Sequence, residues 1–375
     1  MKAVNEPAGN YTESFTKTSK FWRHAHLHFR QNTLTFRARP YREANMPLID
    51  GFGRSIDYLR VSVTDRCNFR CVYCMPHDGV QFMPREELLT YDELERIIGV
   101  FVNLGIEKIR ITGGEPTVRK DIVELVRRIG SLPLRSYAMT TNGYLLDELA
   151  EPLRAAGLQR FNISLDTMRR DRFQKIARFD GYEKTWRGIR KAADLGFAPI
   201  KLNMVVLRGI NDDEIFDFVE LARERSWHVR FIEYMPSSGD LGNTFDASHI
   251  IRTDELKRIV SQKYALIPIT EAVQSGPAKM HTIEGFAGKI GFIDPYAEHF
   301  CAACNRIRLT ALGKLKWCLF SNEGLDIKSF IRSGKSDAEL EAWIRERIVR
   351  DKPEHHPIAI SDMIRANTVF SQVGG

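Results

Sequence analysis

Six cysteines fall into two tight groups whose spacing is typical of metal or redox chemistry. The first group has the spacing C-x3-C-x2-C, and the second has C-x2-C with a third cysteine fourteen residues later: Cys67, Cys71 and Cys74, then Cys301, Cys304 and Cys318. Structural disulfides tie distant loops together, whereas clustered cysteines more often bind metal. Three thiolates are one fewer than a structural zinc site takes. On a 4Fe-4S cluster, three cysteines leave one iron open to a small molecule.

Other interpretations of the cysteines stay open at this point. A zinc site needs a fourth ligand, which His77 would supply to the first group and His299 or His281 to the second. Buried, unreactive thiols are a further alternative, and the clustering disfavours it.

Strand-like and helix-like segments alternate from Ile56 onward and predict a parallel sheet. Six strands are expected at 57–63, 107–112, 136–140, 160–165, 199–206 and 228–234, with helical crossovers between the later ones. Apolar residues at helical spacing predict a helix that begins near Tyr91: Leu94, Ile97, Ile98, Phe101 and Val102. Asp212 and Asp213 are expected to cap a second helix, and 336–348 is a further helical segment. Six βα units fit a partial barrel or a doubly wound sheet.

Polar residues alternate with apolar ones along these strands, although strands buried on both faces of a parallel sheet should be almost uniformly apolar. The polar set includes Arg60, Ser62, Thr64, Lys108, Arg110, Thr112, Asn162, Ser164, Lys201 and Asn203. Because side chains alternate faces along a strand, one whole face of the sheet is expected to be polar. Its cations, with Arg230, would converge in a wet lumen that suits a small polyanion such as a nucleotide triphosphate. A half-exposed antiparallel sheet is the alternative, and the helical crossovers argue against it.

The first cysteine group and its surroundings resemble the radical S-adenosylmethionine superfamily. Tyr73 occupies the aromatic position before the last cysteine, and Thr112-Gly113-Gly114-Glu115-Pro116 is similar to the glycine-rich segment that meets the methionine amino group of the cofactor. The resemblance implies an α/β fold, a partial (β/α)6 TIM-like barrel, with a C-terminal region that carries a second iron-sulfur cluster. It also implies four contacts to S-adenosylmethionine: Tyr73, Gly114, Ser164 and Met235.

Across residues 48–375 the sequence is similar to the GTP 3',8-cyclase family, also called molybdenum cofactor biosynthesis protein A. The segments that carry this resemblance are 59–67, 110–116, 140–143 and 231–235, the second cysteine group and the terminal Gly374-Gly375, a tail thought to enter the active site in this family. The implied cofactors are two 4Fe-4S clusters, one on each cysteine group, and S-adenosylmethionine.

The implied reaction converts GTP to (8S)-3',8-cyclo-7,8-dihydroguanosine 5'-triphosphate, the first step of molybdenum cofactor (molybdopterin) biosynthesis. A 5'-deoxyadenosyl radical formed at the first cluster takes the 3' hydrogen of GTP, and the ribose radical attacks C8 of guanine. The second cluster would hold the guanine. The implied GTP contacts are Arg60, Arg110, Thr140, Lys201, Arg306 and Arg308, of which Arg60, Arg306 and Arg308 are also assigned a catalytic role. Arg306 and Arg308 are two residues apart, so in an extended segment they face the same side.

The resemblance further implies a cytoplasmic monomer or homodimer, an electron donor, and cyclic pyranopterin monophosphate synthase as the downstream enzyme. Two competing functions stay open. A radical S-adenosylmethionine enzyme that modifies a peptide with an auxiliary cluster leaves Arg306 and Arg308 unexplained. A zinc-dependent nucleic-acid-binding module conflicts with cysteine triads in place of tetrads.

Charge and hydropathy place further limits on partners. The net charge is +7, but residues 1–45 hold eight basic and three acidic residues, which leaves only +2 for the rest. This distribution does not favour nucleic-acid binding. No run approaches the roughly 20 apolar residues of a membrane span, so no membrane association is expected.

Three regions are expected along the chain. Residues 1–46 form an N-terminal extension that we predict to be disordered. Its basic, acid-poor composition faintly resembles an organelle transit peptide, and translated sequence upstream of Met46 is an equal alternative. Residues 47–265 form the radical S-adenosylmethionine core, and residues 266–375 form the auxiliary-cluster and GTP-binding region.

Overall fold

Six parallel strands follow one another across the sheet in the order in which they occur in the chain. They are β1 (Tyr58–Ser62), β2 (Lys108–Thr112), β3 (Ser136–Thr141), β4 (Arg160–Ser164), β5 (Lys201–Val206) and β6 (His228–Glu233). Each pairs in parallel with the next. A doubly wound sheet reverses its strand order near the middle, so this sequential order identifies a partial (β/α)6 barrel. The predicted strands are confirmed, each within two residues of the expected bounds.

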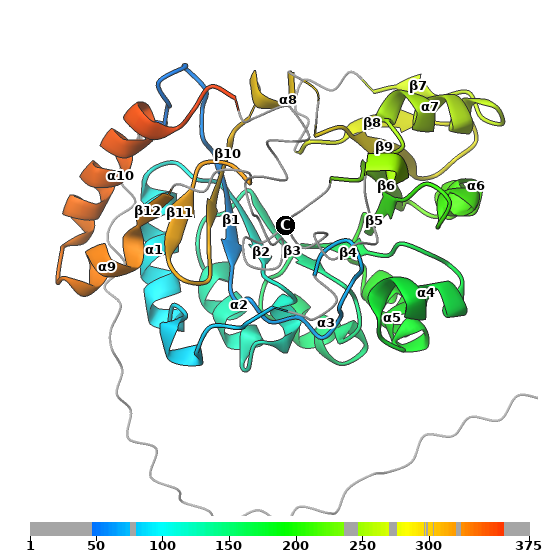
Figure 1. The fold of residues 1–375 in the computed structure, drawn as a ribbon. Helices are drawn as coiled ribbons and strands as arrows, with labels where there is room; N and C mark the ends of the chain where they lie inside the picture. Colours follow the sequence, from blue (N-terminus) through cyan, green and yellow to red (C-terminus); the bar gives the residue numbers. More distant parts are fainter. Residues whose placement is uncertain are drawn as a thin grey trace, which may run out of the picture. The chain divides into compact units, whose positions relative to one another are not determined.

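The structure is a computed structural model, and it describes residues 47–75, 80–235, 247–269, 276–295, 297, 299–302, 304–319 and 324–355 (Figure 1). Residues 44–375 belong to one unit, to which everything below refers. The extension 1–46, the possible zinc ligand His77 and the terminal Gly374-Gly375 lie outside the described residues.

Helices connect the strands and lie along one side of them in Figure 1. They are α1 (Tyr91–Asn103), α2 (Ile122–Gly130), α3 (Leu146–Ala155), α4 (Arg170–Ala177), α5 (Tyr182–Asp194) and α6 (Ile215–Glu220). The strand residues on the helix-covered face form the core, and Leu59, Val61, Ile109 and Ile111 are at most 1% exposed. The alternation in the sequence therefore separates a helix-packed apolar face from a polar one.

The first helix shows how local sequence fixes an element. The Thr90 hydroxyl accepts from the Glu93 N–H at 3.2 Å, and the Glu93 carboxylate accepts from the Thr90 N–H at 2.8 Å. This capping box satisfies two backbone groups that the first turn leaves without helical partners. The predicted apolar stripe of α1 is buried as expected: Leu94, Ile97, Ile98, Phe101 and Val102.

The C-terminal region extends the sheet at both ends. Its strands are β7 (Ile267–Pro268), β8 (Lys279–Thr282), β9 (Lys289–Ile293), β10 (Arg306–Leu309), β11 (Lys314–Lys316) and β12 (Gly324–Asp326). β9 pairs in parallel with β6, and β10 pairs in parallel with β1. The two strands thus cover the edges that a six-stranded sheet would leave open. The expected division of the chain at 265/266 stays a prediction.

The remaining helices are α7 (Thr253–Ser261), α8 (His299–Ala302), α9 (Ile327–Arg332) and α10 (Asp337–Asp351), the last of which confirms the predicted helical segment 336–348. The predicted capping by Asp212 and Asp213 is wrong. Asp212–Glu214 form the 3-10 turn η3, and Glu214 occupies the N-cap position of α6 without a side-chain capping bond. Instead, Asp212 accepts from the Gly209 N–H at 2.9 Å. No helix in the described part of the chain is long and apolar enough to cross a membrane.

Candidate functional site

The first cysteine group lies in the loop that follows β1 and brings its three thiols together. Burial raises the pKa of the Cys71 thiol well above its usual value, and the nearby charges of Asp166, Cys74 and Cys67 raise it further. Burial likewise raises the pKa of Cys67 to about 11. Such thiols stay protonated at neutral pH, and a bound metal centre would convert them to thiolates. The loop therefore offers a ligand set that fits an iron-sulfur cluster.

Aromatic packing and backbone hydrogen bonds hold this loop in place. Phe69 lies in a cluster with ring centroids 5.3 to 5.9 Å away: Tyr144, Phe173 and Phe179. The backbone N–H groups of Arg70 and Val72 donate to carbonyls at the C-terminal end of α4, both at 2.9 Å. The cysteines are thus positioned on a fixed backbone before any metal binds.

Glu115 and Asn142 tie the cysteine loop to the ends of β2 and β3. The buried Glu115 carboxylate accepts from the Asn142 N–H at 2.6 Å and from the Thr141 hydroxyl at 2.7 Å. The Asn142 amide in turn donates to the Asn68 side chain at 2.8 Å and lies 4.0 Å from the Cys67 sulfur. The Thr-Thr-Asn-Gly segment therefore contacts the loop directly.

Gly113 and Gly114 allow the backbone after β2 to approach the start of the cysteine loop. A Cβ atom on Gly114 would lie 2.4 Å from the Arg66 carbonyl oxygen, and one on Gly113 would lie 2.8 Å from the Thr64 carbonyl oxygen. At this close approach the Gly114 N–H donates to the Thr64 carbonyl and the Glu115 N–H donates to the Arg66 carbonyl, both at 2.8 Å. The atoms nearest to these two glycines belong to residues 64–66, and the predicted approach of the segment to the cofactor stays a prediction.

The four predicted cofactor contacts all lie beyond or at the C-terminal ends of parallel strands. Gly114 follows β2, Ser164 ends β4, Met235 follows β6, and Tyr73 lies in the loop after β1, with its hydroxyl donating to Asp166 Oδ2 at 2.6 Å. This edge is where barrels of parallel strands bind their ligands. The individual roles of these residues stay predictions.

A row of cations crosses the sheet on the polar face. Arg60 on β1 has two register partners, Arg308 on β10 and Arg110 on β2. Arg306 is the register partner of Tyr58, so Arg306 and Arg308 lie on this same face, as the sequence predicted. The structure therefore brings Arg60, Arg110, Arg306 and Arg308 together from three strands.

Burial and mutual repulsion lower the pKa values of several cations on this face. Burial, then Arg308, lowers the pKa of Arg60 well below its usual value. Burial, then the neighbouring Arg230 and Arg110, lowers the pKa of Lys201 to about 7. Burial, then Arg110, lowers the pKa of Arg230 to about 9. Within the described residues, no carboxylate lies within ion-pair distance of Arg110, Lys201 or Arg230.

Several buried polar atoms around these cations have no hydrogen-bond partner among the described residues: Arg110 Nε, Arg230 Nε and Nη2, Thr140 Oγ1, Asn162 Nδ2 and Asn203 Oδ1. Buried polar groups are nearly always satisfied, so this set indicates a polar ligand. Lys108 differs from its neighbours, because its ammonium pairs with Asp57 at 2.9 Å. It is therefore neutralised within the protein, unlike Arg110 and Lys201.

The second cysteine group lines one cavity together with the two arginines of β10. The wall of this cavity includes Cys301, Cys304, Cys318, Arg306 and Arg308. Burial would raise the pKa of Cys304, but Arg306 and then Lys352 outweigh it, so that the pKa is lowered. A cavity with three thiols and a lowered pKa at one of them fits a second cluster.

Arg54 joins the second cysteine group to the chain after α10. Its guanidinium donates to the carbonyls of Cys301 at 3.0 Å, Glu354 at 2.5 Å and Pro353 at 2.6 Å, and it pairs with the buried Asp50 at 2.6 Å. The loop before β1 thus fixes both walls of the cavity. Nothing in the spacing of the sequence indicated this role, because the partners lie about 250 and 300 residues away.

The described residues test the zinc alternative at His281 only, because His77 and the side chain of His299 lie outside them. His281 lies on β8 against the ring of Phe292 at 5.3 Å and does not line the cavity of the second cysteine group. No three His, Cys, Asp or Glu side chains among the described residues are arranged to hold a single metal ion. Cysteines of a cubane bind different irons and so stand further apart than the ligands of one ion.

Two family models match the chain: Radical SAM superfamily over residues 61–222, and Molybdenum Cofactor Synthesis C over residues 227–358. The chain is 45% identical to GTP 3',8-cyclase of Desulforamulus reducens over 88% of this chain and 100% of the relative. It is equally similar to GTP 3',8-cyclase of Geobacter sulfurreducens, with the same coverage. It is 46% identical to molybdenum cofactor biosynthesis protein 1 of Drosophila melanogaster over 83% of this chain and 55% of that protein.

Among solved structures, Streptococcus suis SuiB bound to S-adenosylmethionine matches with a TM-score of 0.52 and 15% identity, over 77% of this chain and 67% of SuiB. At this identity the match shows a shared fold. The sheet of parallel strands and its helices thus agree with both the family models and the structural match.

Proposed function

Because the chain belongs to the GTP 3',8-cyclase family of the radical S-adenosylmethionine superfamily, we propose that it converts GTP to (8S)-3',8-cyclo-7,8-dihydroguanosine 5'-triphosphate. This reaction is the first step of molybdenum cofactor biosynthesis. The observation that carries the proposal is the set of cations on the polar face. Arg110, Lys201 and Arg230 have no carboxylate within ion-pair distance among the described residues. The strands β1 and β10, which carry Arg60 and Arg308, adjoin the two cysteine groups.

A triphosphate would relieve the repulsion within this row. Burial of charge is costly unless an opposite charge accompanies it, and the lowered pKa values of Arg60, Lys201 and Arg230 reflect that cost. Arginine also binds phosphate oxygens through two parallel hydrogen bonds. We therefore assign Arg60, Arg110 and Lys201 to the triphosphate, and Thr140, whose hydroxyl has no partner among the described residues, to a further GTP contact.

The first cysteine group would hold the cluster through Cys67, Cys71 and Cys74. A 4Fe-4S cluster with S-adenosylmethionine supplies, when bound, the radical that removes a hydrogen atom from the ribose. The chain's part is position: Gly114, Ser164, Met235 and Tyr73 would hold the cofactor. Holding reactants in place can contribute on the order of 7 kcal/mol or more to lowering the barrier.

A second 4Fe-4S cluster on Cys301, Cys304 and Cys318 is the finer part of the proposal. The cavity that these cysteines share with Arg306 and Arg308 supports it. Since Arg308 is also the register partner of Arg60, one substrate could contact both the cavity and the triphosphate site. Arg306 and Arg308 would then orient the guanine, while Arg60 acts on the ribose-triphosphate side.

A labelling experiment tests the proposed reaction. The protein is purified and reconstituted without oxygen, then incubated with reductant, S-adenosylmethionine and GTP that carries deuterium at C3'. We expect deuterium in the 5'-deoxyadenosine and a product that is an isomer of GTP, identified by chromatography and NMR. GTP labelled at C2' is the control. Unlabelled 5'-deoxyadenosine with no GTP-derived product would contradict the assignment and leave the peptide-modifying alternative.

The other expectations follow from the family resemblance and stay predictions. They are the electron donor, the downstream synthase, the monomeric or homodimeric state and the cytoplasmic location.

A further inference from the structure

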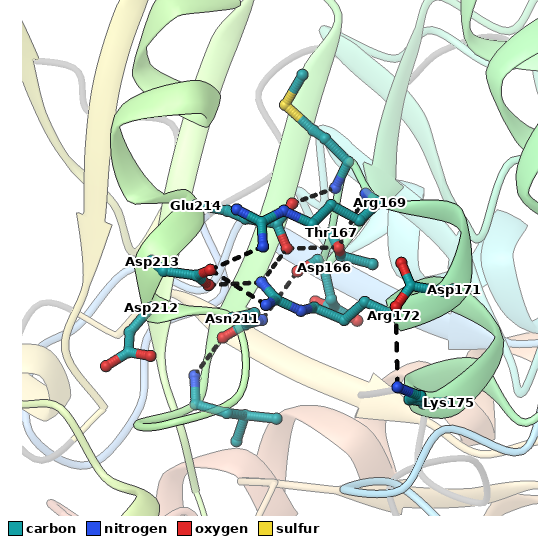
Figure 2. A network of polar contacts seen from close by, with 12 residues as sticks. Asp166, Thr167, Arg169, Asp171, Arg172, Lys175, Asn211, Asp212, Asp213 and Glu214 are labelled. Atoms are coloured by element: carbon teal, nitrogen blue, oxygen red, sulfur yellow. Dashed lines mark hydrogen bonds and ion pairs between the residues drawn. The ribbon is translucent and has the colours of Figure 1, made fainter.

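A buried carboxylate, Glu214, links the segment after β4 to the start of α6 (Figure 2). Glu214 is fully buried and accepts from the Thr167 hydroxyl and from the Met168 N–H, each at 2.6 Å. Its charge is balanced by Arg172, which also bonds both oxygens of Asp213. Two of the bonds that Glu214 accepts thus fix the segment that follows Asp166.

Asn211 fixes the same backbone from the other side. Its fully buried amide donates to the Asp166 carbonyl at 2.8 Å and to the Val205 carbonyl at 2.9 Å, and it accepts from the Leu207 N–H at 2.7 Å. These bonds join the end of β4, the end of β5 and the turn η3. Asp166 therefore stands on a backbone held by two buried side chains.

The Asp166 carboxylate is aimed at the first cysteine loop. One oxygen accepts from the Val205 N–H at 2.9 Å, and the other accepts from the Tyr73 hydroxyl at 2.6 Å. Asp166 is only 8% exposed, so this bond is shielded from water. A carboxylate only accepts hydrogen bonds, which commits the Tyr73 hydrogen to Asp166 and sets the ring in one orientation next to Cys74.

We propose that Asp166 is a positioning residue for the S-adenosylmethionine site and that it acts through Tyr73. The Glu214 and Asn211 network holds Asp166, Asp166 holds the Tyr73 hydroxyl, and the Tyr73 ring then forms a fixed wall beside the first cysteine group. This inference rests on the proposed function, because it takes that loop as the cofactor site. It adds a residue that the sequence did not single out, and a direction for the hydrogen bond.

The test compares wild type with Tyr73→Phe, Asp166→Asn and the double variant, all as reconstituted holoenzyme without oxygen. In Asp166→Asn the amide oxygen keeps the Val205 bond, which turns the NH2 group toward Tyr73 and reverses the bond. Asp213→Asn is the matched control, since it changes the same network at its half-exposed end without touching Tyr73. The readouts are iron content, the dissociation constant for S-adenosylmethionine, and the change in the EPR signal of the reduced cluster on cofactor addition.

We expect Tyr73→Phe to weaken cofactor binding by about tenfold, the value of one hydrogen bond that involves a charged group. Asp166→Asn should weaken it by less, because a neutral, reversed bond replaces the charge-assisted one. Iron content should equal that of wild type, and the EPR change on cofactor addition should be altered in both. Because the two side chains act in series, the double variant should bind no more weakly than the weaker single variant. Asp213→Asn should bind within about twofold of wild type.

Effects that multiply in the double variant, or an Asp166→Asn protein that binds the cofactor as wild type does, would overturn the inference. So would a loss of iron in Asp166→Asn, or an equal loss of affinity in Asp213→Asn, because either result makes Asp166 merely structural. A wild-type protein that holds its clusters but binds no S-adenosylmethionine would instead contradict the proposed function.

Discussion

Arg60 on β1 and Arg308 on β10 are register partners, although nearly 250 residues separate them in the chain. Arg110 is the partner of Arg60 on the other side. Like charges on neighbouring strands are destabilising, and here Arg308 is buried and Arg60 and Arg110 are partly buried. The arginines therefore repel one another across the sheet, and the proposed anionic substrate would reduce this repulsion.

Arg110→Ala and Lys201→Ala should weaken GTP binding by about 10- to 100-fold, the value of one charge-assisted contact to phosphate. Iron content should stay at the wild-type level, because neither side chain contacts a cysteine. Calorimetric titration with GTP and iron analysis measure the two effects. Arg135→Ala, an exposed cation near the start of β3, is the control. If Arg110→Ala and Lys201→Ala both bound GTP with wild-type affinity, the assignment of these residues to the triphosphate would be wrong.

GTP affinity should fall as the pH rises above neutrality. Burial, Arg230 and Arg110 lower the pKa of Lys201 to about 7, so Lys201 is charged below that pH and mostly neutral above it. A triphosphate favours the charged form, and above pH 7 its binding must take up a proton. The dissociation constant should therefore rise by at most about tenfold per pH unit.

Measurements between about pH 7.5 and about pH 9 separate this effect from the phosphate groups, which are already ionised there. Arginine has a higher ordinary pKa than lysine, so Lys201→Arg should move the dependence to higher pH. If the dissociation constant for GTP depended on pH equally steeply over this range in Lys201→Arg, the proton taken up on binding would belong to another group.

Arg230→Met should stabilise the protein in the absence of GTP. Burial, then Arg110, lowers the pKa of Arg230 to about 9, so at pH 7 the unfolded chain holds this proton more tightly and the charge opposes folding. Replacing a buried charge with an apolar side chain of similar length can contribute about 1 to 4 kcal/mol. Thermal unfolding should show a melting temperature a few degrees above wild type. Arg127→Met on the surface of α2 should change it little, and a lower melting temperature for Arg230→Met would contradict this account.

Arg54→Ala should release the second cysteine loop. It removes the bonds to the carbonyls of Cys301, Pro353 and Glu354. The buried Asp50 keeps two backbone hydrogen bonds, but its nearest remaining cation among the described residues is Lys352 at 3.5 Å. Loss of one partner from a buried ion pair costs about 3 to 5 kcal/mol. We expect iron content to fall toward that of one cluster. The control is Arg332→Ala, which breaks an ion pair with Glu93 at the surface and should keep the iron content of wild type. Wild-type iron content in Arg54→Ala would show that the Arg54 bonds do not hold the second cluster.

Gly114→Ala should separate the segment after β2 from the cysteine loop. The added Cβ would meet the Arg66 carbonyl oxygen at 2.4 Å and its carbon at 2.6 Å, so the backbone must shift. Reduced iron content at the first cluster is the expected result. Gly99→Ala in α1 meets nothing within 4 Å and should stabilise the helix by about 1 kcal/mol. Unchanged iron in Gly114→Ala would show that the loop tolerates the shift.

The sequence predicted most of the barrel because its signals are local. The period of apolar residues located α1 and the six strands, and alternation along β1, β2 and β5 revealed the polar face. The pairing of β9 with β6 and of β10 with β1 depends on contacts between distant segments, which no short pattern encodes. Asp166 lies two residues beyond the end of β4, where strand alternation no longer applies, and the sequence did not single it out. No pattern in the sequence pointed to Arg54, because its partners are distant in the chain.

The way β9 and β10 complete the sheet also has a consequence for synthesis on the ribosome. The free edge of β6 is covered only after residue 293 has emerged, and that of β1 only after residue 309, so the six-stranded sheet presents open strand edges while translation continues. Exposed edges invite pairing with other chains. We expect the nascent protein to need a chaperone until its last strands arrive, and a premature stop before β10 to yield an aggregating fragment rather than a smaller working enzyme.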